Sequence, residues 1–257
     1  MSAPLTPLCT ADDASFWPWR TWTDFARLSP AEKLATTVIV PVAGMADWGL
    51  GHPLDAEELV LMHVIKSAVQ APPAGFVPLV IPPLRFVLGP ATSGAFAVDP
   101  PTAHALLREV ALSIHASGFR RLILFNASPW NEELCAAASR DLRIELGLQV
   151  FRINLGHIGL DFHPTRSTNR REVQTVVTCL TGRLPEPGPA VEPTTKPRWG
   201  DETVVPLAGP GVPLDRALIQ GAELLAATKA RVLSLFGEIA AYPPLPRGGA
   251  LATQTPP

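Results

Sequence analysis

RLILFNASPWN (residues 121–131) joins an apolar run to the start of a helix and carries the clearest structural signal in the chain. Its first five residues, RLILF, end in four apolar residues, which is typical of a strand buried on both faces. EELCAAASRDLRIELG (132–147) follows with apolar residues at helical spacing and a terminal glycine. LQVFRINL (148–155) then has the composition of another strand. This succession predicts parallel pairing, with the turn after the first strand as the place for chemistry.

The same alternation extends in both directions along the chain and predicts an α/β fold. Further elements are expected as strands at 36–44 and 76–84, helices at 55–70, 101–119 and 216–239, and a short helix or strand at 171–182. Prolines in the 76–84 run favour an edge position or an early end. The strands near 37–43, 121–126 and 148–154 are expected in the middle of a mainly parallel central sheet, covered by helices on both faces.

Changes in composition along the chain predict its domain organisation. An aromatic-rich arm, with three tryptophans in WPWRTW, occupies residues 1–30, and its helix is expected to end near Pro30. One α/β domain is expected over 31–242, followed by a disordered tail at 243–257. At the start of the 55–70 helix, Asp55 and Glu58 have the spacing of a capping box.

Composition also excludes several classes of partner. The 257 residues carry a formal net charge of −2 without a block of like charges, which argues against nucleic acid and membrane partners. No apolar run reaches the roughly 18 residues that span a bilayer, and no signal peptide is evident. The three cysteines are too scattered for a disulfide framework or a metal pair. We therefore expect a cytoplasmic protein.

Two turns of the sequence resemble the signatures of the creatininase family of amidohydrolases. In PVAGMADWGLGHPLDAEE (41–58), four residues match the first signature without a gap: Pro41, Gly49, Pro53 and Leu54. The second signature, Asn-Gly-His-Gly-Gly-Asn after GFRR and an apolar strand, falls on Asn126 to Asn131. The resemblance implies a three-layer α/β fold, frequent oligomerisation and a two-metal Zn or Mn site. Such sites hydrolyse C–N bonds in cyclic amides and related substrates.

Most of the family's metal-ligand positions are substituted in this chain. The two ligands of the first turn fall on Ala46 and Trp48, and the histidine of the second turn falls on Ser128. Trp130 lies where one branch of the family has a glutamate. The family's bridging aspartate falls on Glu57, and a later ligand segment falls on Asn169 to Glu172. Only Glu57 and Glu172 therefore keep a metal-binding side chain at these positions. Because a two-metal site needs many oxygen or nitrogen donors, we expect no metal cofactor.

The two tryptophans in ligand positions define a candidate ligand pocket. It comprises residues of both turns and of the later segment: Trp48, Trp130, Asn126, Ser128, Asn131 and Asn169. The indoles could fill the volume left by the metal ions, or form a stacking platform for a planar or cationic ligand. Local packing unrelated to the old site is the third interpretation.

These substitutions favour a non-catalytic function. We expect a ligand-binding, scaffolding or regulatory subunit, assembled as a homo-oligomer or with an active paralogue. The alternative is a creatininase-like amidohydrolase with a remodelled site, in which Glu57, Glu172 and His52 supply the acid–base chemistry. His157 and His163 are further acid–base candidates for that alternative.

Overall fold

A five-stranded parallel sheet forms the centre of the computed structural model, which describes residues 15–88, 96–163, 169–186, 207, 209 and 211–243. Its four longer strands are β1 (Thr36–Ala43), β2 (Val77–Val80), β4 (Arg121–Asn126) and β5 (Gln149–Asn154). Their order is β2-β1-β4-β5, and the short β3 (Leu84–Arg85) pairs with the end of β1. Every pairing is parallel, as the sequence predicts.

Burial explains which strands lie in the middle. All positions of β1 and β4 are buried, in agreement with their continuous apolar runs. β2 begins exposed and lies at an edge, as its prolines indicate. The expectation that β5 lies in the middle is wrong for the described strands, since β5 forms the other edge. The α5 side chain of Arg143 donates to the Val150 carbonyl of β5 at 2.9 Å.

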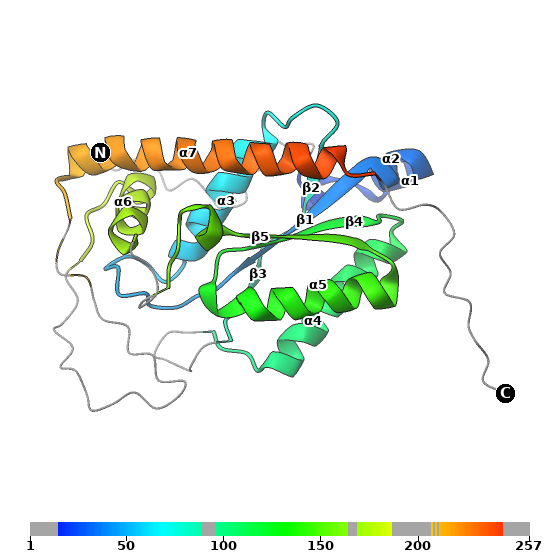
Figure 1. Ribbon diagram of the computed structural model, residues 1–257, viewed down its shortest axis with the longest axis horizontal. Coiled ribbons are helices and arrows are strands. Elements are labelled where there is room, and N and C mark those ends of the chain that lie inside the picture. The colour runs from blue at the N-terminus through cyan, green and yellow to red at the C-terminus, as the bar shows by residue number, and fades with distance from the viewer. Residues whose placement is uncertain are drawn as a thin grey trace.

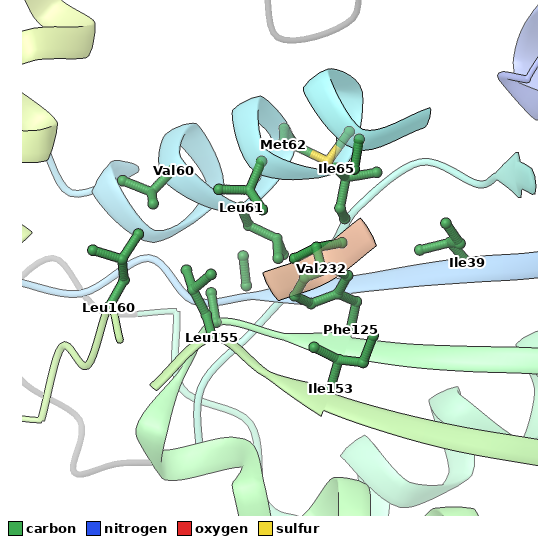
Figure 2. Packing of buried hydrophobic residues seen from close by; sticks show 14 of the residues in the cluster. Ile39, Val60, Leu61, Met62, Ile65, Phe125, Ile153, Leu155, Leu160 and Val232 are labelled. Carbon is green, nitrogen blue, oxygen red and sulfur yellow. The ribbon is translucent and has the colours of Figure 1, made fainter. Parts of the chain in front are cut away.

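Helices cover both faces of the sheet and give three layers (Figure 1). One face carries α3 (Ala56–Val69), α6 (Arg170–Thr181) and α7 (Leu214–Ala241). The other carries α4 (Pro100–Ala116) and α5 (Glu132–Leu146). Figure 2 shows the first core, where Leu61 and Ile65 of α3 and Val232 of α7 gather over Phe125 of β4. Burial of these apolar side chains supplies the main stabilisation of the layers.

The N-terminal arm differs from the sequence prediction. Two short helices, α1 (Trp22–Arg27) and α2 (Pro30–Ala35), replace the single helix expected to end near Pro30. Ser29 caps α2 and Pro30 occupies its first turn, where a proline is tolerated because its missing N–H would have no helical partner. Trp17 and Phe25 pack together on Phe119, with the Trp17 ring 5.4 Å from that of Phe119. The arm therefore contributes to the core over its described part.

Two further expectations have different outcomes. The prediction of a capping box at α3 is wrong, because Asp55 makes no side-chain capping bond. Glu58 instead forms a salt bridge with Arg85 at 2.5 Å. The predicted tail lies outside the described residues from position 244 onward. Within the described ranges, no helix combines the length and apolar character needed to cross a membrane.

Candidate functional site

The turns after β1 and β4 meet because these strands are parallel neighbours that end at the same side of the sheet. The backbone N–H of Ala127 donates to the Val42 carbonyl at 2.9 Å and joins the two strand ends. Trp48 of the first turn and Trp130 of the second lie in contact, with ring centroids 4.4 Å apart and planes tilted by 43°. Phe162 borders Trp48 at 6.3 Å. The structure thus brings the two candidate tryptophans together.

A buried carboxyl group lies beside this aromatic pair. Glu57 comes from the first turn of α3, is 0% exposed, and accepts a hydrogen bond from the Gly44 N–H at 2.5 Å. Burial raises the pKa of Glu57 to about 7, because removal from water disfavours the charged carboxylate. The Gly44 N–H, the Ser128 hydroxyl and the Trp48 indole N–H face the carboxyl and act in the opposite direction on that pKa. The group therefore titrates near neutrality.

Three polar side-chain atoms beside the tryptophan pair lack hydrogen-bond partners among the described residues. Within the described residues, Trp48 Nε1, Glu57 Oε1 and Ser128 Oγ are buried and make no hydrogen bond of acceptable geometry. The indole N–H and the hydroxyl still lie close enough to Glu57 to lower its pKa, although neither meets the distance and angle of a full hydrogen bond. Each buried polar atom without a partner costs about 1–3 kcal/mol. We call these three residues the Glu57 cluster.

The two asparagines of the second turn hold the backbone. Asn126 donates to the Ser128 carbonyl at 2.7 Å and to Asn154 at 3.2 Å, and accepts from the Ser128 N–H at 3.2 Å. Asn131 donates to the Phe86 carbonyl at 2.8 Å and accepts from the Leu88 N–H at 3.1 Å. Both side chains are buried. Their amides thus fix the turn that presents Ser128 and Trp130.

Residues of α6 fix the first turn. Arg170 donates to the Trp48 carbonyl at 2.6 Å, and Gln174 donates to the Leu50 carbonyl at 2.8 Å. Asp47 accepts from the Gly49 N–H at 2.8 Å inside the turn. Burial lowers the pKa of the Arg170 guanidinium, as does neighbouring Arg171, whereas Asp47 raises it. The sequence places Arg170 inside the later ligand segment without predicting this bond, since no local pattern signals a contact over 122 positions.

The same turn also contacts the two ends of a long connection. The Glu186 N–H donates to the Gly51 carbonyl and the Leu207 N–H donates to the Gly49 carbonyl, each at 2.8 Å. Gly51 has a positive φ of 70°, and an added Cβ would lie 2.2 Å from the Glu186 carbonyl oxygen. Only glycine permits this close approach of the two backbones.

The acid–base candidates occupy different environments. Glu57 is fully buried, whereas Glu172 is exposed and lines an open groove of about 680 Å³ between α6 and α7. His52 shares a 3.0 Å hydrogen bond with the Thr178 hydroxyl, and burial lowers the pKa of its ring. Asn169, the last candidate pocket residue, lies at the N-terminal cap of α6. These positions place only Glu57 in the buried cluster with Trp48 and Ser128.

The other two histidine candidates lie elsewhere. His157 is exposed, with its ring 3.7 Å from the Glu132 carboxylate. The backbone N–H of His163 donates to the Asp161 carboxylate at 2.9 Å. Neither contact includes Glu57.

The donors at the two turns do not fit a pair of Zn or Mn ions. Among the described residues, no three His, Cys, Asp or Glu side chains lie together as a possible metal site. The Glu57 cluster offers one carboxyl and one hydroxyl, and its indole N–H can only donate. A two-metal centre needs more oxygen or nitrogen ligands than these. The metal content of the protein itself stays a prediction.

Comparisons with known proteins agree with the geometry of the fold. The sequence model described as creatininase, creatinine amidohydrolase, matches residues 19–185. A creatininase in its Mn form shares 18% identity over 90% of this chain and 100% of its own, with a TM-score of 0.63. A mutant creatininase complexed with creatine shares 17% identity over 90% and 100%, with a TM-score of 0.61.

A Bacteroides fragilis protein described as a creatinine amidohydrolase is also similar. It shares 14% identity over 90% of this chain and 98% of its own, with a TM-score of 0.65. At such identities the solved structures show a common fold and confirm the three-layer α/β prediction. No sequence among the curated proteins gives a significant match.

Proposed function

The chain belongs to the creatininase family, and we propose that it is a non-catalytic member, acting as a ligand-binding, scaffolding or regulatory subunit. One observation carries this proposal: Trp48, Glu57 and Ser128 form a buried cluster where the resemblance implies metal ligands. The cluster supplies donors aimed at a carboxyl group instead of ligands aimed at cations. Water activation by a bound metal therefore has no support from these residues.

The ligand-binding form of the proposal concerns the outer side of the tryptophan pair. With ring centroids 4.4 Å apart, the indoles leave no space for a planar ligand between them. Trp48 is 2% exposed, whereas Trp130 is half-buried and keeps some accessible surface. A planar or cationic ligand would therefore stack on the accessible part of Trp130. Assembly as a homo-oligomer, or with an active paralogue, belongs to the same proposal.

Metal analysis and hydrolysis assays test the non-catalytic function. We expect far less than one Zn or Mn per chain after dialysis, and no hydrolysis of creatinine or other cyclic amides, with or without added metal. A chelator should leave the melting temperature unchanged, because no metal binding is coupled to folding. Stoichiometric metal after dialysis, or a chelator-sensitive amidase activity, would contradict the proposal.

A remodelled amidohydrolase is the second candidate, because a carboxyl with a pKa of about 7 suits general acid–base catalysis. Glu57, Glu172 and His52 would then act without the inherited metal set. This alternative predicts metal-independent hydrolysis with an apparent pKa near that of Glu57. Separate Glu57→Gln, Glu172→Gln and His52→Asn variants assign the activity, and unchanged activity in all three would exclude these residues.

A further inference from the structure

Helix α7 presents a long outward face that no other described element covers. Its 28 residues lie along one side of the molecule, at the top of Figure 1. Its inward side packs against α3 and α6. The buried residues of that side are Ala217, Gly221, Leu225, Thr228, Val232, Phe236 and Ile239. The opposite side is exposed along about 40 Å of helix, and its residues Glu223 and Ala227 also line the open groove between α6 and α7.

Four exposed charges on this helix have a symmetric order. Arg216, Glu223, Arg231 and Glu238 follow one another at intervals of seven, eight and seven residues, which keeps them on one flank of a helix. Arg216 and Glu238 each lie eleven residues from Ala227, and Glu223 and Arg231 each lie four residues from it. Reversal of the chain direction about Ala227 thus places each positive charge against a negative one. The flank is complementary to itself.

Contacts among the described residues do not explain the order of these charges. Opposite charges stabilise a helix when they lie three or four residues apart, and these intervals are about twice as long. None of Arg216, Glu223 and Glu238 forms an ion pair in the described part of the chain. Arg231 donates to the Ile158 carbonyl at 2.7 Å and keeps an exposed side chain. An antiparallel second copy of α7 would give all four charges a partner.

The surface next to the charged flank would allow close contact. It consists of Ile219, Ala226, Ala230 and Gly237, of which Ile219 is 63% exposed. A Cβ added to Gly237 would meet nothing within 4 Å, so packing within the described chain does not require this glycine. Glycine inside a helix is nevertheless unfavourable relative to alanine. In the antiparallel arrangement, Ile219 of one copy falls opposite Leu235 of the second, two positions from Gly237, where the absent side chain leaves room.

We propose that α7 binds α7 of a second copy of this chain, antiparallel and about a twofold axis at Ala227. The crossing angle is small, about 20°, because Arg216 and Glu238 must stay close at the two ends. The interface is isologous, so each ion pair occurs twice. This inference rests on the oligomeric part of the proposed function and holds whether or not the protein is catalytic. Since a single helix pair is a small interface, we expect dissociation in the micromolar range.

Sedimentation velocity with charge-reversed variants of the full chain tests this surface. Arg216→Glu places two negative charges together and Glu238→Arg places two positive charges together. Each variant should therefore dimerise at least about tenfold more weakly than the parent protein. A mixture of the two variants should recover dimers, because each then supplies the charge that the other needs. Arg140→Glu, an exposed charge reversal on α5, is the matched control and should dimerise like the parent.

Gly237→Leu tests the apolar part of the contact. The added side chain should block the approach of the second helix and weaken dimerisation, while the melting temperature of the monomer stays equal or rises. A parent protein that stays monomeric up to about 100 μM would overturn the proposal. Dimers that survive both Arg216→Glu and Gly237→Leu would place the interface elsewhere. Mixed charge variants that fail to associate would refute the antiparallel order, and none of these results depends on metal content or hydrolysis.

Discussion

Replacing Glu57 with glutamine should remove a large pH dependence from the stability of the protein. In the folded state the pKa of Glu57 is about 7, against an ordinary value of 4.5. The folded protein therefore holds this proton more tightly than the unfolded chain. As pH rises from about 4.5 to about 7, the unfolded chain releases the proton first, so the free energy of unfolding falls, and above about 7 the loss is complete.

The magnitude follows from the difference between the two pKa values. Each pKa unit corresponds to about 1.4 kcal/mol, so ionisation of Glu57 should lower the stability of the parent protein by about 3 kcal/mol across this range. The side chain is fully buried, so solvent screening does not reduce the figure. Glutamine has nearly the same shape, can accept the Gly44 N–H bond and does not ionise in this range. The variant should therefore gain about 3 kcal/mol relative to the parent between about pH 4 and about pH 8.

Urea unfolding followed by tryptophan fluorescence and circular dichroism measures this effect. Free energies of unfolding for both proteins are compared at intervals from about pH 4 to about pH 8. Glu172→Gln is the control for the loss of a carboxyl group as such, because Glu172 is exposed on α6. Parallel curves for the parent and Glu57→Gln would show that Glu57 does not titrate in this range. The assignment of a buried, near-neutral carboxyl would then be wrong.

Three further changes test the packing and the inherited positions. Trp48→Ala should lower the free energy of unfolding by about 3–5 kcal/mol in urea titrations. Trp130→Ala should lower it by less, because only Trp48 is almost fully buried. Equal small losses would contradict the interpretation that the indoles fill the volume left by the metal ions. Asn131→Ala should cost about 2 kcal/mol in the same assay, since it leaves the Phe86 carbonyl and the Leu88 N–H without their partner, and Asn131→Asp should retain part of the stability by accepting from Leu88. A combined variant restores the family residues at four positions: Ala46→Glu, Trp48→His, Glu57→Asp and Ser128→His. It should acquire Zn or Mn, measured by elemental analysis. A folded variant that binds no metal would show that the alignment of these positions with the family signatures is wrong.

Most of the fold could be predicted from the sequence, because apolar spacing and turn residues are local signals. The strand predicted at 36–44 is β1 at Thr36–Ala43, and the helix predicted at 55–70 is α3 at Ala56–Val69. Gly147 ends α5 with a positive φ of 60°, as expected of a glycine after a helix. The resemblance in the two turns added the family, which the match over residues 19–185 confirms.

What the sequence could not predict depends on contacts between distant segments. The spacing of Asp55 and Glu58 predicts a local cap, but Glu58 bonds to Arg85 27 positions away, and no local pattern includes that contact. Similarly, the sequence identified Glu57 as a candidate without indicating its complete burial or the donors that face it. The edge position of β5 depends on which strands pair, and strand composition alone does not determine this.

Two backbone hydrogen bonds limit where the chain can change in length: the Leu207 N–H bonds to Gly49, and the Glu186 N–H bonds to Gly51. Twenty residues separate Glu186 from Leu207, yet both ends attach to carbonyls only two positions apart. The free energy of closing a loop changes slowly with its length, so insertions or deletions between these anchors should be tolerated without displacement of the sheet.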